Sequence, residues 1–319
     1  MKLSNSKTEK TILCLAYLLT FAVVAFAALK LFIQATVDGD SAYRADMKEN
    51  YENYLPIIPE KLDFCGEEVP LQNFDVRESL EKELLKTMYW HSETFLYIKR
   101  SNRFFPRISQ ILKENKVPED FVYLCVAESG LDNVVSPAKA VGFWQILETT
   151  GKENGLEINS DVDERYDFEK STETACKFLK QAYAKFHNWT LAAASYNCGQ
   201  AGMQRVVTAQ GENSYYDLRL NTETGRYIYR ILAYKLLLTH PDDYGFVFRE
   251  KDLYPQIKTK SIEVDTAVND LYAFAKEVSL NYKMLKYLNP WLRNTKLPNP
   301  DNKVYKIKVI DENERKSVY

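Results

Sequence analysis

One short stretch constrains this chain more than any other. Phe121 to Ser129 is apolar on almost every side, carries Glu128 near its end, and is followed by Gly130. Helices commonly end at a glycine, and a helix that is apolar all round is buried, so we predict a buried helix that ends here. Glu128 then lies at the rim of that helix, where loss of hydration raises the pKa of its carboxyl toward that of a general acid. The plain alternative is a solvent-facing glutamate, because most glutamates lie on the surface.

Length and composition indicate a globular protein. The 319 residues leave room for one large domain and a small one, and 45% hydrophobic with 27% charged residues is ordinary for a globular chain. A net charge of -2, without a basic stripe that interleaves aromatics, argues against a nucleic-acid partner. The 22 tyrosines and 16 phenylalanines suit sugar-stacking surfaces and a packed core equally well.

The cysteines and histidines predict no metal site. The chain has no C-x-x-C pair and its three histidines are scattered, so no zinc signature can be written, and we expect no metal or cofactor. Cys125 and Cys176 occupy core-like helical positions, where a free cysteine behaves as a small hydrophobe. A disulfide among the four cysteines outside the N-terminal apolar run remains open.

Residues 1–34 read as a membrane anchor or a signal segment. No charge interrupts residues 11–29, and the apolar character resumes through Ile33. A helix over 11–33 is long enough for a hydrocarbon core of about 30 Å. The preceding lysines favour an inside N-terminus, which places the body of the protein outside the cytoplasm. Ala25-Phe26-Ala27 also fits a signal-peptidase site, but the apolar run continues past it, so we favour an uncleaved anchor.

The rest of the chain divides into three regions. Residues 35–75 are polar and punctuated by prolines, which predicts a connector without a firm element. Residues 76–250 show helical periodicity and predict an all-α domain. Its expected helices include 93–100, 105–115, 190–197, 226–239 and an amphipathic helix capped by Ser171. The helix over 190–197 consists almost wholly of small residues, so it should lie deep in the domain.

Residues 258–312 predict a small βααβ module. Ser261–Val264 reads as a strand, Leu271, Phe274, Ala275 and Val278 form one helical face, and Tyr282–Leu288 fits a second helix. Tyr305, Ile307 and Val309 alternate with lysines, which is typical of a half-buried strand. The fold class expected for the whole chain is therefore mainly α.

Four motifs, the first at the end of the Glu128 helix, stand in an order that resembles a known family. They are Ala127-Glu128-Ser129-Gly130, Ser136-Pro137, Gly142-Phe143-Trp144-Gln145-Ile146 and Ala194-Ser195-Tyr196-Asn197-Cys198-Gly199. This series resembles the soluble-lytic-transglycosylase domain that is shared with goose-type lysozymes. The resemblance extends to Glu223-Thr224 and Tyr227, and so covers roughly residues 105–240. Leu288-Asn289-Pro290 is similar to a LysM motif, although the start of that module's first helix lacks the usual glycine.

The resemblance implies a lysozyme-like fold and a peptidoglycan lytic transglycosylase. Such an enzyme cleaves the bond between N-acetylmuramic acid and N-acetylglucosamine and leaves a 1,6-anhydro end. Glu128 would act first as acid and then as base, so a second carboxylate is not obligatory, unlike in most glycosidases. Asp132, Glu148, Asp163 and Asp167 are candidates for one only if geometry permits. The partners implied are peptidoglycan strands and, through residues 11–33, a membrane.

The same resemblance implies a set of substrate-binding residues. It includes a loop serine, a backbone glycine, a glutamine near the acid, a tyrosine whose phenol reaches toward the acid, and an asparagine that binds an acetamido group. These are Ser136, Gly142, Gln145, Tyr196 and Asn197, with Glu223 and Tyr227 where the last helix begins. Each also has a plain structural alternative, such as a loop serine, an exposed glutamine or a buried tyrosine bonded to backbone. Phe143 and Trp144 fit the core or the cleft wall better than a specific ligand role.

Two other functions stay open at this point. A hydrolytic muramidase of the same fold would use water in place of the sugar's C6 hydroxyl, and a wall-binding scaffold would keep the fold without the reaction. The presence of Glu128 argues against the scaffold. The loop from Glu128 to Ser136 is one residue shorter than is typical of the family, which affects the placement of Ser136 and leaves Glu128 in register.

Overall fold

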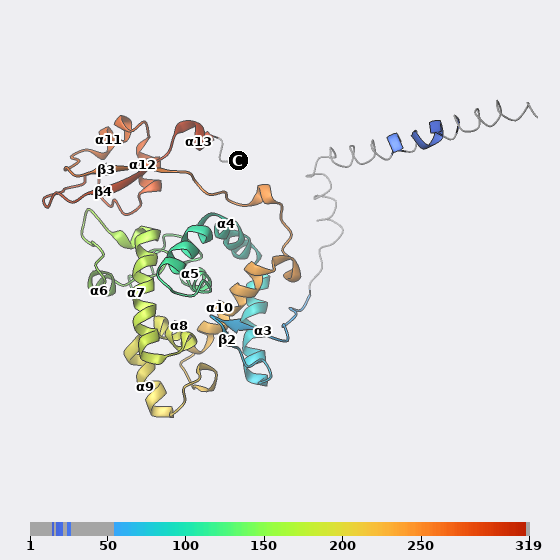
Figure 1. Ribbon diagram of the computed structural model, residues 1–319. Helices are drawn as coiled ribbons and strands as arrows, with labels where there is room; N and C mark the ends of the chain where they lie inside the picture. Colours follow the sequence, from blue (N-terminus) through green and yellow to red (C-terminus); the bar gives the residue numbers. More distant parts are fainter. Residues whose placement is uncertain (1–14, 16, 22–23, 27–53, 317–319) are drawn as a thin grey trace, which may run out of the picture. The chain divides into compact units, whose positions relative to one another are not determined.

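The computed structural model describes residues 15, 17–21, 24–26 and 54–316 (Figure 1). The chain divides into two compact units, Met1–Leu55 and Pro56–Tyr319. In the first unit the described residues 15, 17–21 and 24–26 are helical and exposed. Within the described part of the chain, no helix has the length and apolar character needed to cross a membrane. Much of the predicted anchor, residues 11–33, lies outside the described residues.

A small hairpin precedes the helices, in a stretch where the sequence predicted no element. The strands β1 (Asp63–Phe64) and β2 (Glu67–Glu68) pair antiparallel. The two residues between them have positive φ, 55° at Cys65 and 80° at Gly66, as tight hairpin turns require. Strands of two residues are too short to leave an alternating pattern in the sequence. The hairpin nevertheless contributes to the core, because Phe64 is fully buried.

Two long helices follow, α3 (Phe74–Tyr89) and α4 (His91–Glu114). The prediction of two separate helices over 93–100 and 105–115 is wrong, because α4 continues through Pro106. A proline inside a helix leaves the carbonyl four residues earlier without its usual donor. Asn102, which carries that carbonyl, is exposed, as is Pro106, so water can reach the gap.

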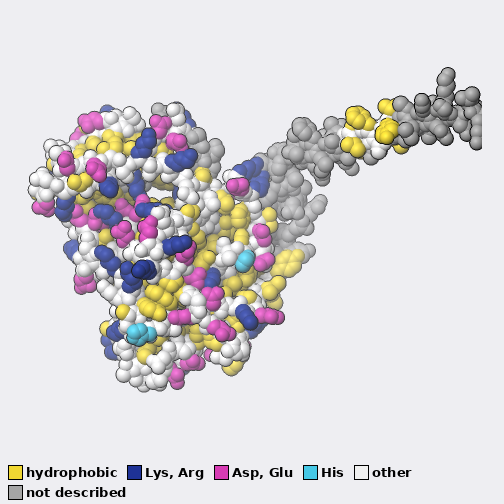
Figure 2. All heavy atoms as spheres, viewed as in Figure 1, with side chains coloured by type: hydrophobic (Ala, Val, Ile, Leu, Met, Phe, Trp, Pro, Cys, Tyr) yellow, Lys and Arg dark blue, Asp and Glu magenta, His cyan; other side chains and the backbone are white. Residues whose placement is uncertain are grey.

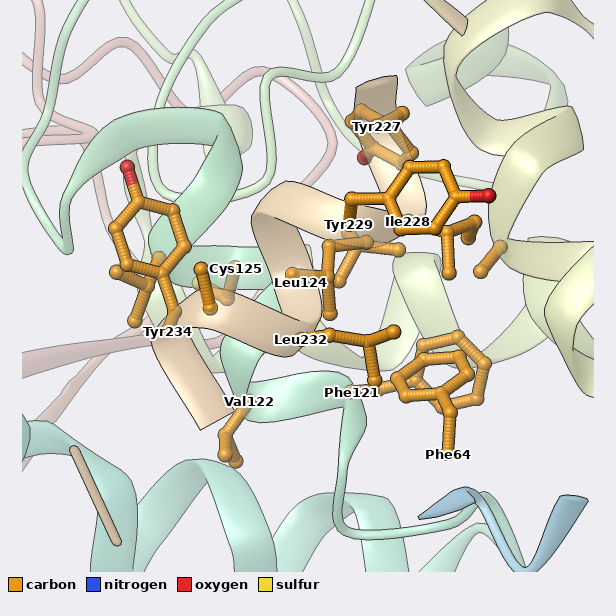
Figure 3. Packing of buried hydrophobic residues seen from close by; sticks show 14 of the residues in the cluster. Phe64, Phe121, Val122, Leu124, Cys125, Tyr227, Ile228, Tyr229, Leu232 and Tyr234 are labelled. Atoms are coloured by element: carbon orange, nitrogen blue, oxygen red, sulfur yellow. The ribbon is translucent and has the colours of Figure 1, made fainter. Parts of the chain in front are cut away.

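The core is built around three helices: α5 (Phe121–Ser129), α8 (Trp189–Cys198) and α10 (Thr224–Thr239). Figure 3 shows apolar side chains of α5 and α10 packed together, with Phe121 beside Phe64 of the hairpin. The rings of Phe64 and Phe121 meet edge to face at 5.5 Å. The small residues 192–195 of α8 are fully buried, as the sequence predicts, because side chains of this size let neighbouring backbones approach closely.

The remaining elements surround this core. They are α6 (Glu148–Glu153), η1 (Glu164–Tyr166), α7 (Phe168–Phe186), α9 (Gln200–Gln210), η2 (Tyr215–Asp217), η3 (Pro241–Tyr244) and η4 (Glu250–Asp252). The predicted cap of α7 is wrong: Asp167, not Ser171, accepts the backbone N–H groups of Glu169 and Lys170. Ser171 lies one turn inside the helix and is fully buried.

The C-terminal residues form the predicted βααβ module. Strand β3 (Lys260–Val264) pairs antiparallel with β4 (Tyr305–Val309), and Ile262 lies opposite Ile307. Between the strands come α11 (Leu271–Glu277) and α12 (Tyr282–Leu288), and α13 (Glu312–Lys316) follows β4. The module has its own apolar core, and the fold class is mainly α as predicted.

Backbone bonds and ion pairs join this module to the helical domain. The Asp163 N–H donates to the Trp291 carbonyl at 2.9 Å, and the Arg293 N–H donates to the Asp161 carbonyl at 2.8 Å. Lys308 of β4 forms an ion pair with Glu169 of α7 at 2.5 Å. Because backbone groups pair directly, the contact fixes the register between the two segments.

Candidate active site

Glu128 lies near the end of α5, as the sequence predicts, and Gly130 ends the helix just beyond it. Gly130 is left-handed with φ 61°, and its N–H donates to the Val126 carbonyl at 2.8 Å. A Cβ at this glycine would lie 2.4 Å from the Tyr97 ring, so only glycine fits both the backbone and the space. The glycine thus fixes where the helix stops, and with it the position of Glu128.

The Glu128 carboxyl is only partly accessible to solvent and accepts a short hydrogen bond from the Tyr227 hydroxyl. Tyr227 is fully buried on α10, where Figure 3 shows it among the apolar side chains of the core. Burial raises the pKa of Glu128 to about 7, while the Tyr227 bond and the positive charge of Arg230 oppose the rise and Glu223 adds to it. Near neutral pH a substantial fraction of the carboxyl is therefore protonated and able to donate a proton.

Arg230 is a member of this site that sequence reasoning missed. Its guanidinium carbon lies 5.6 Å from the centroid of the Tyr227 ring, in cation–π range. Within the described part of the chain, its buried Nε has no hydrogen-bond partner. The available signal was its position three residues after Tyr227, which places both on one helix face.

The loop after α5 closes onto the end of that helix. The Ser129 hydroxyl donates to the Phe143 carbonyl at 2.8 Å. A Cβ at Gly142, which has φ 82°, would lie 2.1 Å from the Arg165 carbonyl oxygen, so this position requires glycine. The Gln145 side-chain amide donates to the carbonyls of Gly142 at 2.8 Å and Val134 at 3.1 Å. These bonds show Gln145 holding the two ends of the loop together.

Ser136 shapes a turn in the same loop. Its hydroxyl oxygen accepts the Ala140 N–H at 3.0 Å, and its backbone N–H donates to the Ala140 carbonyl at 2.9 Å. The side chain keeps partial exposure. Ser136 thus has a structural partner within its own turn.

The phenol of Tyr196 forms its hydrogen bond with the backbone. Its hydroxyl donates to the Trp144 carbonyl at 2.8 Å, and burial raises its pKa well above the usual range, with the charge of Glu128 as a further cause. The phenol that donates to the acid is that of Tyr227. Trp144 and Phe143 are buried, as the sequence predicts for wall or core residues.

Asn197 and Glu223 lie together, although 26 residues separate them in the chain. The Asn197 amide donates to the Glu223 carboxylate at 3.2 Å, and the Thr224 hydroxyl donates to the Asn197 amide oxygen at 2.8 Å. The end of α8 is thereby bound to the start of α10, which carries Tyr227.

The other carboxylates that the sequence offered have partners elsewhere. Asp132 pairs with Arg100 at 2.8 Å, Glu148 with Lys152 at 2.6 Å and Asp163 with Arg165 at 2.7 Å. Asp167 caps α7. The four cysteines in the described part of the chain, Cys65, Cys125, Cys176 and Cys198, are free. The geometry therefore favours a site with one acid, in which Glu128 is supported by Tyr227 and Arg230.

Comparison with known proteins finds similar sequences. The chain is similar to "Membrane-bound lytic murein transglycosylase D" of Escherichia coli strain K12 and of E. coli O6:H1 strain CFT073, with 29% identity to each over 191 residues. The aligned segment covers 57% of this chain and 41% of each relative, so the chain spans less than half the length of the relatives it matches.

Two family models also match. Residues 107–218 match the transglycosylase SLT domain, which includes Glu128 but ends before Tyr227, and residues 260–313 match the soluble lytic transglycosylase C-terminal LysM-like domain. The second match coincides with the βααβ module. The chain is therefore similar to a transglycosylase SLT domain and, farther along, to a soluble lytic transglycosylase C-terminal LysM-like domain.

Proposed function

We propose that this protein is a peptidoglycan lytic transglycosylase with a lysozyme-like catalytic domain. The observation that carries the proposal is Glu128 itself: burial at the end of α5 raises its pKa to about 7, and Tyr227 holds the carboxyl by a hydrogen bond. The SLT-domain match and the similarity to a lytic murein transglycosylase support the same reading.

The reaction needs one acid that works twice. Protonated Glu128 gives its proton to the glycosidic oxygen between N-acetylmuramic acid and N-acetylglucosamine as the bond from C1 to that oxygen breaks. The carboxylate then takes the proton of the C6 hydroxyl on the same muramoyl residue while O6 bonds to C1. The product carries a 1,6-anhydro ring, the acid is regenerated, and no water is consumed. The substrate's N-acetyl group stabilises the positive charge at C1.

The remaining site residues would hold the strand. Asn197 and Glu223 offer an amide and a carboxylate suited to an acetamido group and sugar hydroxyls, and they are already oriented by Thr224. The loop closed by Gln145 would present Ser136 and the backbone at Gly142 to the sugar beside Glu128. Tyr196 would support the cleft wall through Trp144.

The C-terminal module and the N-terminal segment would keep the enzyme at its substrate. We propose that residues 258–312 bind glycan and that residues 11–33 anchor the chain to a membrane, with the body on the periplasmic side in the bacterial envelope. The uncharged run over 11–29 supports the anchor, and the LysM-like match supports the module. Basic and acidic side chains are interspersed on the face seen in Figure 2, which argues against a nucleic acid as the partner.

Digestion of purified peptidoglycan tests this function. The wild-type protein is expected to release fragments with anhydro ends, which mass spectrometry finds one water lighter than hydrolysed ends. Glu128→Gln removes the transferable proton and should lower the rate by roughly 10²–10⁴-fold while the protein stays folded. Reducing ends from the wild type would indicate a hydrolytic muramidase, and an unimpaired Glu128→Gln variant would refute the assignment of the acid.

A further inference from the structure

A hollow of about 530 Å³ lies between α9 and the segment that leads into α10. Gly202, Arg205 and Gln210 line it from α9, and Arg219, Asn221 and Thr224 line it from the other side. Its volume lies in the range of sites that take small ligands. The catalytic arrangement described above makes no use of this space.

The charged residues that line the hollow are two arginines, Arg205 on one side and Arg219 on the other. Each is exposed, and within the described part of the chain no hydrogen bond or ion pair engages either guanidinium. One guanidinium nitrogen of Arg205 lies 4.0 Å from the point where a Cβ on Gly202 would stand, so the group lies beside the helix at this residue. No Asp or Glu lines the hollow to neutralise the two charges.

The wall that carries Arg219 is held in place by a side chain of α9. The Gln210 amide donates to the Arg219 carbonyl at 2.9 Å and accepts the Arg219 N–H at 2.9 Å. Asn221 fixes the next step, because its side-chain oxygen accepts the Thr224 N–H at 2.8 Å. The backbone on both sides of the hollow is thus set before any ligand binds, which reduces the entropy lost on binding.

The hollow adjoins the proposed cleavage site. Thr224 belongs to its wall and also donates to Asn197, which pairs with Glu223. Along α10, Thr224 stands three residues before Tyr227, the donor to Glu128, so less than one helical turn of about 5.4 Å separates them. A group attached to a sugar at the cleavage site is within reach of this space.

We propose that Arg205 and Arg219 bind carboxylates of the peptide stem that N-acetylmuramic acid carries on its lactyl group. This inference rests on the proposed function, because the stem belongs to the proposed substrate. A planar guanidinium matches a carboxylate with two parallel hydrogen bonds, and the stem is the part of a peptidoglycan strand that offers such groups. The pocket would make the enzyme prefer strands that still bear their stems over strands stripped of them.

Cleavage of two substrates by the full chain tests the pocket. One substrate is glycan with its stems, and the other is the same glycan after an amidase has removed them. For the Arg205→Gln/Arg219→Gln variant we expect about a tenfold lower kcat/KM on stem-bearing strands, mostly through KM, and an unchanged value on stripped strands. Arg205→Lys/Arg219→Lys keeps both charges and should recover part of the loss.

Two outcomes for the Arg205→Gln/Arg219→Gln variant would refute stem binding in this pocket and leave the proposed function intact. They are an equal loss of kcat/KM on both substrates, or no loss on stem-bearing strands. Calorimetric titration with a soluble muramoyl tetrapeptide, compared with muramic acid that lacks the peptide, makes the test independent of catalysis. We expect the wild type alone to bind the tetrapeptide more tightly. If the wild type cleaved neither glycan and still bound the tetrapeptide more tightly, the proposed catalytic function would be refuted and the proposed binding of the stem would be supported.

Discussion

At the scale of single residues, the site depends on a bond between side chains that lie 99 positions apart. Tyr227 donates to Glu128, and its hydrogen bond is of the kind that favours the charged carboxylate. Burial acts in the opposite direction and is the larger effect, since it raises the pKa of Glu128 to about 7. Burial and the hydrogen bond therefore shift the pKa of Glu128 in opposite directions, and removing either should change that pKa.

Tyr227→Phe removes the hydroxyl and keeps the ring. The carboxylate loses a donor, so its protonated form becomes relatively more stable and the pKa of Glu128 rises. In the proposed reaction Glu128 must be protonated to act, so the fall in activity at high pH should move to higher pH in this variant. The pH dependence of kcat/KM measures the shift. If the fall in kcat/KM at high pH stayed in place or moved to lower pH, the Tyr227 hydrogen bond would not be lowering the pKa of Glu128.

The sequence predicts Glu128 for a physical reason: an apolar run followed by glycine marks both the burial and the end of the helix. It does not distinguish Tyr196 from Tyr227 as the donor, because both are buried tyrosines on core helices and only tertiary packing decides which phenol faces the carboxyl. The sequence does not predict Arg230 as a site residue, because a single basic residue on a helix near the end of the domain has the same pattern as a solvated surface charge.

At the scale of elements, the loop after α5 is fixed by close backbone contact. Gly142→Ala would place a methyl group 2.1 Å from the Arg165 carbonyl at a positive φ. We expect a loss of about 1–3 kcal/mol in the free energy of unfolding, together with lower activity as the loop shifts. Urea unfolding measures the first and peptidoglycan digestion the second.

Gly211→Ala is the matched control for that change. It also has positive φ, 72°, but nothing lies within 4 Å of an added Cβ. Its cost should reflect the backbone conformation alone and leave activity unchanged. Equal losses of stability and activity in both variants would contradict a special role for the approach to Arg165.

The hairpin before α3 supplies a cap to a core helix. The Glu67 carboxylate accepts the backbone N–H groups of Trp189 at 2.5 Å and Thr190 at 2.9 Å, and the Thr190 hydroxyl at 2.7 Å. Glu67→Ala should lower the free energy of unfolding by about 1–2 kcal/mol, since two backbone N–H groups and one hydroxyl at the start of α8 lose their partner. Glu68→Ala, at the exposed neighbouring position, should leave the unfolding free energy within about 0.5 kcal/mol. Equal effects would mean that the cap does not stabilise α8.

Elements with a long periodic pattern could be predicted, and elements defined by single contacts could not. Helical spacing of apolar residues predicts the amphipathic helix α7, and alternation of apolar residues with lysines predicts the strand β4. The hairpin is too short for periodicity, and the continuity of α4 through Pro106 depends on which side of the helix faces solvent. The cap of α7 was misplaced because Ser171 and Asp167 are both common cap residues, one turn apart.

At the scale of the whole molecule, the helical domain and the C-terminal module each have an apolar core, and both lie within the compact unit of residues 56–319. The sequence predicts that the C-terminal module exists, because alternation and helical spacing are local properties. It could not predict how the module docks, because the contact uses the irregular segments 161–163 and 291–293 together with Lys308. Arg165, from the same region, pairs with Asp163 and approaches Gly142 through its carbonyl, which links the docking region to the loop beside Glu128.

The central claim is that the fold keeps one buried carboxyl protonated near neutrality so that it can donate to a glycosidic oxygen. The pH dependence of kcat/KM for the wild-type protein on stem-free glycan tests it most directly, because this profile reports the pKa of the acid in the free enzyme. We predict a descending limb near pH 7 that follows the pKa of Glu128. A limb near the ordinary glutamate value of about 4.3, with activity already lost at pH 6, would contradict the account.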